Sequence, residues 1–167
     1  MTSLDRIFAV ALIVALAAAL LWLGRAEERL AGPVRVIDGD TLAFGDRRIR
    51  LRGLDAPELD QTCQRADDTA YRCGETARDA LRRLVRTGPV TCLISGRDRY
   101  GRGLARCEAF GTDLGAALVQ AGLAVAYGGY AGEEQEARTA RRGLWAGRFE
   151  RPDAWRRERG RDVRTSP

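Results

Sequence analysis

The order of short strand-like runs and one amphipathic segment constrains the fold of this chain more than any other feature. Three strand-like runs come first, one helical segment follows, and two more strands come after it. The third run, Arg48–Arg52, alternates cleanly, with Ile49 and Leu51 on one face and arginines on the other. The predicted strands cover residues 34–37, 41–44, 48–52, 90–94 and 104–110.

The helical segment over residues 75–86 places its apolar side chains on one face, and Gly88-Pro89 ends it. Two further helices are predicted over residues 113–121, capped by Thr112 or Asp113, and over residues 133–142. Five strands with a helix between the third and the fourth form the connectivity of an OB-fold. The sequence therefore predicts an α+β chain, a five-stranded OB-fold β-barrel with about three helices.

An uncharged run, Ile7–Leu23, precedes the predicted barrel as a hydrophobic helix. It is shorter than the about 20 residues of a membrane-spanning helix and longer than the roughly 7–15 residues of a signal peptide core. We expect residues 1–26 to be a signal peptide cleaved after Ala26 or an anchor in the inner membrane. A buried core helix is a less favoured alternative. Export to the periplasm or the exterior is expected in either favoured case.

The rest of the chain divides into three parts. Residues 27–32 are interpreted as a polar linker, residues 33–149 as the folded domain, and residues 150–167 as an Arg-rich tail. We expect Trp145 and Phe149 to pack against the barrel and the chain to be disordered beyond about Arg159. An auxiliary contact of the tail with nucleic acid or a membrane surface is the alternative.

Composition narrows the chemistry. The chain has no histidine and no lysine, so all 28 basic residues are arginine. This excludes a Ser-His-Asp triad, an imidazole base, a His-ligated zinc and a lysine Schiff base. Proton transfer falls to Asp, Glu, Tyr, Cys or water, and a hard metal falls to carboxylate and carbonyl oxygens. The net charge of +5 favours an acidic partner such as nucleic acid.

The four cysteines do not show the spacing of a zinc site. In an exported chain an even number of cysteines indicates disulfides, and three pairings are possible. The predicted hairpin register places Cys92 opposite Cys107, which favours that pair. Four reduced core cysteines are expected if the chain is not exported.

Three clusters carry the candidate chemistry, and each has a plain structural interpretation as a turn or a strand end. They are Ile37–Thr41, Arg50–Glu58 and Asp98–Gly103. Together they supply the groups that phosphodiester hydrolysis requires. Two aspartates are hard ligands for a divalent cation, a glutamate can take a proton from water, and two arginines can neutralise a phosphoryl group. These residues are Asp40, Asp55, Glu58, Arg50 and Arg102.

The motifs V-I-D-G-D-T, R-L-R-G-L-D-A-P-E and D-R-Y-G-R-G, in this order, resemble the staphylococcal nuclease (thermonuclease) family. The later G-L-A-V-A-Y and A-R-R-G-L-W-A-G also look like that family, so the resemblance runs from Val34 to Trp145. It implies a calcium-dependent OB-fold nuclease that cuts DNA and RNA.

The resemblance implies a role for each matching residue. Asp40 and Asp55 match the calcium carboxylates, and Ala56 matches a residue whose backbone carbonyl also binds calcium, where the family often has Thr. Glu58 matches the residue that activates or orients water. The two arginines that bind the scissile phosphate are matched by Arg50 and Arg102.

Aromatic and turn positions follow the same pattern. Tyr100 and Tyr127 match positions that line the nucleotide pocket, whereas an insertion offsets Tyr130. Asp38 matches the family's D-G-D turn, and we expect it to position the site residues without contacting the cation itself. By this resemblance we expect a monomer that prefers single strands, because a base must stack on tyrosine.

Two features depart from the family pattern. The cysteines look like those of exported bacterial relatives, in which Cys63 and Cys73 staple the loop after Glu58. Contacts that the family makes with lysine can be made here only by arginine. Arg52, Arg97 and Arg99 are candidates for phosphate contacts, but we expect solvated charges.

Two other functions compete with catalysis. Nuclease-like OB domains can lose catalysis and keep recognition, which would make this chain a nucleic-acid-binding module. An exported envelope scaffold is the second alternative, and it predicts no calcium binding near Asp40 and Asp55.

Overall fold

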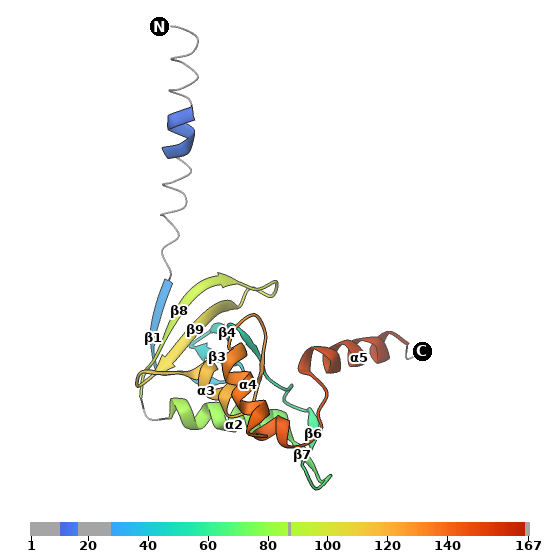
Figure 1. The fold of residues 1–167 in the computed structure, drawn as a ribbon. Coiled ribbons are helices and arrows are strands. Elements are labelled where there is room, and N and C mark those ends of the chain that lie inside the picture. The colour runs from blue at the N-terminus through green and yellow to red at the C-terminus, as the bar shows by residue number, and fades with distance from the viewer. Residues whose placement is uncertain (1–10, 17–27, 87, 166–167) are drawn as a thin grey trace, which may run out of the picture.

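The computed structural model describes residues 11–16, 28–86 and 88–165, with side chains described as far as Arg159. Figure 1 shows a curled sheet with α2, α3 and α4 gathered beside it. The main sheet contains β1 (Glu28–Gly32), β2 (Arg35–Val36), β3 (Thr41–Phe44), β4 (Arg47–Leu51), β8 (Val90–Arg97), β9 (Gly103–Ala109) and β10 (Thr112–Asp113). Two short ladders pair β5 (Leu54–Asp55) with β11 (Val125–Ala126) and β6 (Thr62–Gln64) with β7 (Ala70–Arg72).

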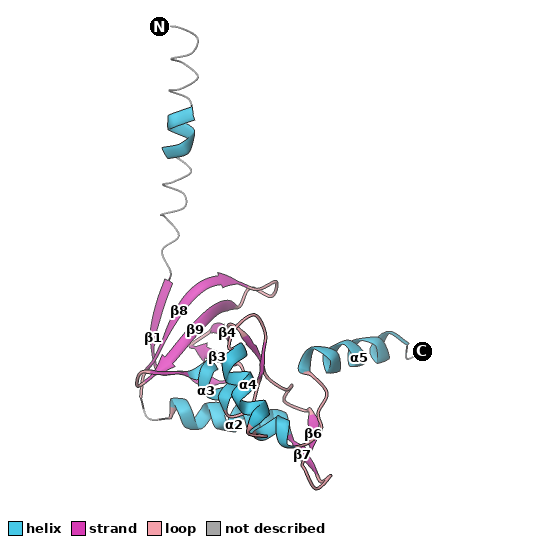
Figure 2. Cartoon of the chain, in the orientation of Figure 1, coloured by secondary structure: helices cyan, strands magenta, loops and turns pink. Residues whose placement is uncertain are grey.

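The helices are α2 (Cys73–Val85), α3 (Leu114–Gln120), α4 (Ala131–Thr139), the 3-10 helix η1 (Gly143–Ala146) and α5 (Pro152–Thr165). Figure 2 shows the strands of the main sheet grouped together, with α2, α3 and α4 on one side of them. All five predicted strands are present in the main sheet, whose order is β1-β8-β9-β4-β3-β2. The parallel pairing of β4 with β9 joins the two halves, and the other ladders are antiparallel. Mixed α+β content and a curled sheet fit an OB-like fold.

The core lies between this sheet and the helices. Ile49 and Leu51 of β4 are buried as the alternation predicts, and so are Ala77 and Leu81 of α2. Asp113 is the residue that caps α3, because its side chain accepts a hydrogen bond from the backbone N–H of Ala116 at 3.0 Å.

Residues 27–32 were expected to form a linker, but Glu28–Gly32 form the edge strand β1. Its partner is β8, with Leu30 opposite Cys92 and packed against the core. Glu28 forms a two-pronged ion pair with Arg47, at 2.6 and 2.9 Å. A polar strand at a sheet edge satisfies the backbone of its neighbour while exposing one face to solvent, so its composition resembles that of a linker.

Both disulfides have the predicted partners. Cys92 and Cys107 face each other across β8 and β9, with their Cα atoms 4.1 Å apart. Cys63 and Cys73 connect β6 to the first residue of α2, with Cα atoms 5.6 Å apart. The Cys63–Cys73 bridge fixes the segment that follows Glu58 to the start of α2.

The C-terminal region is more ordered than the sequence suggests. The rings of Trp145 and Phe149 meet edge to face, 4.9 Å apart, and pack against a small core around Cys63–Cys73 that is separate from the main core, not against the barrel as predicted. The tail begins with helix α5, which the sequence did not predict, whereas disorder beyond about Arg159 stays a prediction, because the side chains past that residue lie outside the described ones. Pro152 is buried at the first helical position, where its ring suits a helix start. Ion pairs to acidic residues elsewhere in the chain then hold the helix.

Of the predicted N-terminal helix, residues 11–16 are described, and they are helical and exposed. The rest of residues 1–26, including the expected cleavage point, lies outside the described residues. Within the described part of the chain, no helix combines the length and apolarity needed to cross a bilayer.

Candidate functional site

The sequence-predicted residues meet in one cleft of about 840 Å³ beside β4 and β5. Of the predicted site residues, Asp40, Arg50, Asp55, Ala56, Glu58, Tyr100, Arg102 and Tyr127 all line it. They come from the turn before β3, from β4, from β5 and the loop that continues it, from the β8–β9 hairpin and from the segment after β11. Strand order therefore gathers residues that are distant in the sequence.

A tight turn places Asp40 at the floor of this cleft. The side chain of Asp38 accepts a hydrogen bond from the backbone N–H of Asp40 at 3.0 Å, which shapes the turn. Gly39 lies so close to its neighbours that a Cβ atom would be 2.7 Å from the Ala56 Cβ and 2.9 Å from the Ala77 Cβ. Because glycine permits this approach, the Ala56 N–H reaches Asp40 Oδ2 at 3.2 Å.

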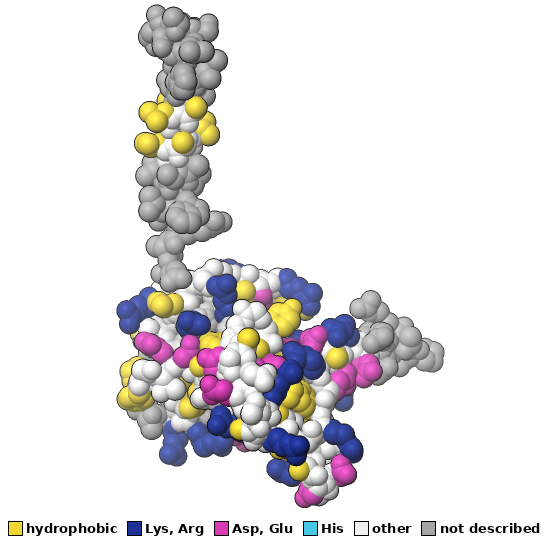
Figure 3. All heavy atoms as spheres, viewed as in Figure 1, with side chains coloured by type: hydrophobic (Ala, Val, Ile, Leu, Met, Phe, Trp, Pro, Cys, Tyr) yellow, Lys and Arg dark blue, Asp and Glu magenta, His cyan; other side chains and the backbone are white. Residues whose placement is uncertain are grey.

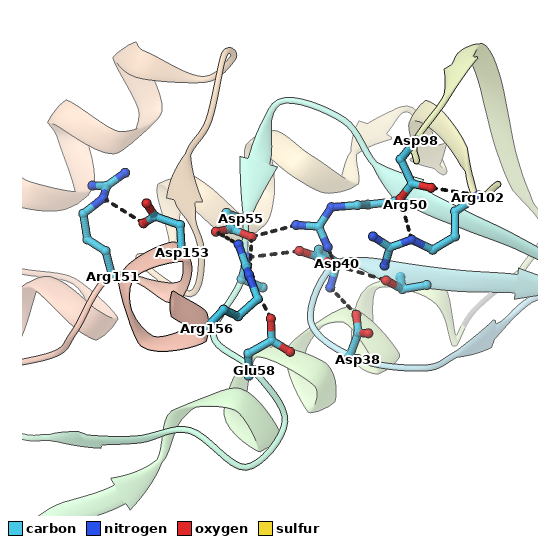
Figure 4. A network of polar contacts seen from close by, with 12 residues as sticks. Asp38, Asp40, Arg50, Asp55, Glu58, Asp98, Arg102, Arg151, Asp153 and Arg156 are labelled. Atoms are coloured by element: carbon cyan, nitrogen blue, oxygen red, sulfur yellow. Dashed lines mark hydrogen bonds and ion pairs between the residues drawn. The ribbon is translucent and has the colours of Figure 1, made fainter. Parts of the chain in front are cut away.

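Arg50 connects the two aspartates. It lies on the face of β4 opposite Ile49 and Leu51, so its side chain leaves the core and enters the cleft. Its guanidinium donates to Asp40 Oδ1 at 2.7 Å and to Asp55 Oδ1 at 2.6 Å (Figure 4). Both carboxylates are almost completely buried, with exposed side-chain fractions of 5% and 3%.

Burial dominates the electrostatics of Asp40. It raises the pKa of this carboxyl to about 7, against the opposing effect of the Arg50 charge. The negative charges of Asp38 and Asp55 act in the same direction as burial. A buried carboxylate with a raised pKa holds its negative charge most readily when a cation lies beside it.

A fully buried glutamine holds the backbone at Glu58. Gln61 Oε1 accepts the Glu58 N–H at 3.2 Å, and the Gln61 N–H donates to the Glu58 carbonyl at 2.8 Å. Gly74, near the start of α2, presses against that carbonyl, since a Cβ atom there would be 1.8 Å from it. The backbone of Glu58 is thus fixed, while its side chain remains 37% exposed and faces the cleft.

Arg156 of α5 is the site residue that the sequence did not reveal. Its two terminal nitrogens donate to Asp55 at 3.1 and 2.8 Å, and one of them also donates to Glu58 Oε1 at 2.7 Å (Figure 4). Partial burial lowers the pKa of Arg156, but the bonds to Asp55 and Glu58 outweigh this effect and raise it overall. The only sequence signal was the density of arginine in the tail.

Arg102 lies at the hairpin side of the cleft. Its Nε donates to Asp98 Oδ2 at 2.7 Å, and Asp98 Oδ1 accepts the backbone N–H groups of Tyr100 and Arg102. Asp98 therefore organises the turn and orients Arg102 at once. In Figure 4 this pair lies on the side of Arg50 away from Arg156.

The tyrosines separate into two groups. Tyr100 and Tyr127 line the cleft and are 69% and 67% exposed. Tyr130 is half-buried, packs over Gly53 and Gly115, and donates its hydroxyl hydrogen to Asp113 at 3.0 Å. This contact gives Tyr130 a structural role.

The three arginines considered as further phosphate contacts have protein partners. Arg52 donates to the Ser95 hydroxyl at 2.9 Å, Arg97 donates to the Gly101 carbonyl at 3.2 Å, and the Arg99 guanidinium lies 4.8 Å from the centre of the Tyr100 ring. Across the face seen in Figure 3, basic and acidic side chains are mixed.

The donor set at the floor of the cleft suits a hard cation. Asp40 and Asp55 supply two buried carboxylates, and Ca²⁺ takes such oxygens together with backbone oxygens and water. Among the residues that the structure describes, no three acidic or cysteine side chains converge as a ready-made metal cluster. A cation bound here would therefore depend on backbone oxygens, water or substrate to complete its coordination.

Comparison with known proteins gives one consistent result. The family model described as "Staphylococcal nuclease homologue" matches residues 48–147, which include every predicted site residue except Asp40 and Asp38. A succinoglycan biosynthesis protein, ExoI, of Rhizobium meliloti (strain 1021) is 37% identical over 127 residues, covering 72% of this chain and 66% of the relative.

Two further relatives carry nuclease names. An uncharacterized endonuclease of Escherichia coli O157:H7 is 36% identical over 124 residues, covering 68% of this chain and 74% of that protein. A probable staphylococcal-like nuclease, CAN1, of Oryza sativa subsp. japonica is 33% identical over 128 residues, covering 72% of this chain and 36% of that protein. The chain thus spans between about one third and three quarters of these relatives.

Proposed function

Because the chain belongs to the staphylococcal nuclease homologue family, we propose that it is a calcium-dependent endonuclease that hydrolyses phosphodiester bonds of DNA and RNA. One observation carries the proposal. Two buried aspartates, a cleft-facing glutamate and the guanidinium of Arg50 meet at the floor of one cleft, and Arg102 lies on its rim. These are the groups that the reaction requires, and they come from four separate segments.

Asp40 and Asp55, with the backbone carbonyl of Ala56, would hold the cation. When bound, it supplies Lewis-acid polarisation of a phosphate oxygen. Glu58 orients the attacking water or takes its proton as the new phosphorus–oxygen bond forms and the bond to the leaving oxygen breaks. The fixed backbone at Glu58 supports this role, because a base must be positioned before it can act.

The two arginines stabilise charge. Arg50 enters the cleft beside both aspartates, so a phosphate bound next to them meets its guanidinium. Arg102 approaches from the hairpin and is oriented by Asp98. A planar guanidinium can grip two phosphate oxygens at once as negative charge builds on them.

Single strands are the preferred substrate in this proposal. Tyr100 and Tyr127 are exposed at the cleft, where an unpaired base can stack on an aromatic ring. A duplex would have to open before its base reached either ring. A monomer suffices, since one chain supplies every group.

The cellular setting is also proposed. Two disulfides support an oxidising compartment, and hence export to the periplasm or the exterior. Residues 1–26 would then serve as a cleaved signal peptide or as an inner-membrane anchor. We propose that residues 33–149 form a five-stranded OB-fold barrel, to which β1 and the short β10 are added strands.

A cleavage assay tests the function. The full chain is mixed with matched single-stranded DNA, duplex DNA and RNA, with calcium, with magnesium or with a chelator. We expect calcium-dependent cutting, fastest on single strands and abolished by the chelator.

A pair of variants separates catalysis from binding. Glu58→Gln should cut about 10²–10³ times more slowly than wild type, whereas Glu108→Gln on the exposed face of β9 should cut normally. A folded Glu58→Gln protein with full activity would sink the mechanism. A gel mobility shift of nucleic acid that stays uncut by wild type would indicate a binding module. Absence of both the shift and the cleavage would favour a scaffold.

A further inference from the structure

A segment that lies outside the matched family region reaches into the cleft. Arg156 lies beyond residue 147, the last residue matched by the family model, and 101 positions from Asp55. It holds both oxygens of the Asp55 carboxylate and one oxygen of Glu58. These are the groups proposed above to hold the cation and to activate water.

The start of α5 is anchored to the loop that carries Glu58. Gln61 donates to the carbonyl of Glu150 at 2.7 Å, and Gln64 and Arg148 exchange two backbone hydrogen bonds at 2.8 and 3.1 Å. The Cys63–Cys73 bridge fixes this loop to α2. Because the loop and the helix are tied together, Arg156 is delivered to the cleft by the fold.

A second arginine on the same face of α5 reinforces the contact. Arg159 lies one helical turn after Arg156 and donates to Asp60 at 2.8 Å. The two arginines therefore grip Glu58 and Asp60 from one side. The Asp60 contact lies outside the residues that line the cleft.

Arg156 and a cation require the same lone pairs. Asp55 Oδ1 already accepts from Arg50 and Arg156, and Oδ2 accepts from Arg156. A carboxylate filled in this way has little capacity left for a metal ligand bond. The Arg156 guanidinium and a cation bound to the same carboxylate would also repel each other.

We propose that Arg156 is a built-in competitor for the cation site, so that Arg156 and a divalent cation bind Asp55 in turn. This inference rests on the proposed function, since it concerns the same carboxylates. Helix α5 thereby sets the cation concentration at which the cleft becomes active. When the cation enters, Arg156 leaves Asp55 and Glu58, and the carboxylate of Glu58 becomes available to water.

Calcium binding alone tests the proposal. Calcium is titrated calorimetrically into the full chain as wild type, Arg156→Ala and Arg157→Ala. Arg157 is the matched control, because it is the next residue of α5, carries the same charge and pairs with Asp153. We expect Arg156→Ala to bind calcium roughly tenfold more tightly than wild type, and Arg157→Ala to bind as wild type does.

A conservative variant and a second readout sharpen the test. Arg156→Lys keeps the charge but loses the planar fork, so its calcium affinity should lie between those of wild type and Arg156→Ala. Hydrogen exchange of residues 152–159 in wild type should quicken when calcium is added, while exchange in α2 stays unchanged.

The proposal is overturned if Arg156→Ala binds calcium no more tightly than wild type, or if Arg157→Ala tightens binding equally. The two hypotheses fail separately. Cleavage by wild type with unchanged calcium affinity in Arg156→Ala would refute the competitor and leave the nuclease intact. Tighter calcium binding by Arg156→Ala, with no cleavage by wild type, would support the competitor and refute the nuclease.

Discussion

Two clusters in this molecule pair buried acids with arginines, and they differ in what surrounds them. At the cleft, Asp40 pairs with Arg50, and Asp55 pairs with both Arg50 and Arg156. On α4, Glu134 binds Arg138 and accepts the backbone N–H of Ala126. The acids in both clusters are at least nine-tenths buried by side-chain exposure.

The two clusters differ in whether their acids face the cleft, where a ligand can reach them. Glu134 joins α4 to β11 and is absent from the residues that line the cleft. Asp40 and Asp55 face that cleft, and Arg156 of α5 reaches Asp55 from a separate segment. A buried acid paired with arginine thus has a structural role when protein groups surround it completely. The same pair is a candidate binding site when it faces a cleft and a ligand can replace the arginine.

The largest effect is expected from Arg50→Ala. It removes a phosphate-binding donor and leaves both aspartates short of a partner, so cleavage of single-stranded DNA should fall about 10²–10³-fold. Initial rates at saturating calcium measure this, with the exposed Arg83→Ala on α2 as the control. A rate equal to wild type would remove Arg50 from the mechanism.

Arg102→Ala should lower the same rate by about 10²-fold, because it too removes a guanidinium from the cleft. It should cost little stability, since Arg102 is bonded to Asp98 in a turn rather than to the buried aspartates. Cleavage rates and urea unfolding of the two arginine variants, compared side by side, separate these effects. If Arg102→Ala lowered the free energy of unfolding as much as Arg50→Ala does, Arg102 would have a structural role that the account does not give it.

Glu134→Gln should lower the stability of the fold without lowering the cleavage rate, the opposite of Arg102→Ala. Losing the charge weakens the bonds to Arg138 and Ala126 and should reduce the free energy of unfolding by about 1–3 kcal/mol. The cleavage rate per folded molecule should not change. Urea unfolding and active-fraction measurements decide this, and a loss of activity in fully folded protein would mean that the two clusters are coupled.

The exposed pair between Arg47 and Glu28 should matter least. Both side chains are more than 40% exposed, so solvent screens the pair despite its short 2.6 Å contact. Arg47→Ala should leave the urea midpoint and the cleavage rate unchanged within error. A clear drop in the midpoint would show that β1 depends on this pair for its docking.

The strands and most of the site could be predicted because they depend on local patterns. Alternation at Arg48–Arg52 sends Arg50 into the cleft while Ile49 enters the core, and turn chemistry places Asp40. The hairpin register likewise gives Cys92–Cys107. These features need only the period of a strand and the geometry of a turn.

The missed features depend on partners that are far away in the sequence. Strand β1 is polar and becomes a strand only because β8 offers an unpaired edge. Arg156 belongs to a charged tail whose helix is held by Asp55, Glu58 and Asp60. No local pattern distinguishes such an arginine from a solvated one.

The most direct test of the central claim compares Asp55→Asn with Glu134→Gln as matched removals of one buried negative charge. The measured quantity is the initial rate of single-stranded DNA cleavage at saturating calcium, per folded molecule. The account predicts that Asp55→Asn loses at least about 10²-fold in rate while Glu134→Gln retains the wild-type rate. Full activity in a folded Asp55→Asn protein would contradict it.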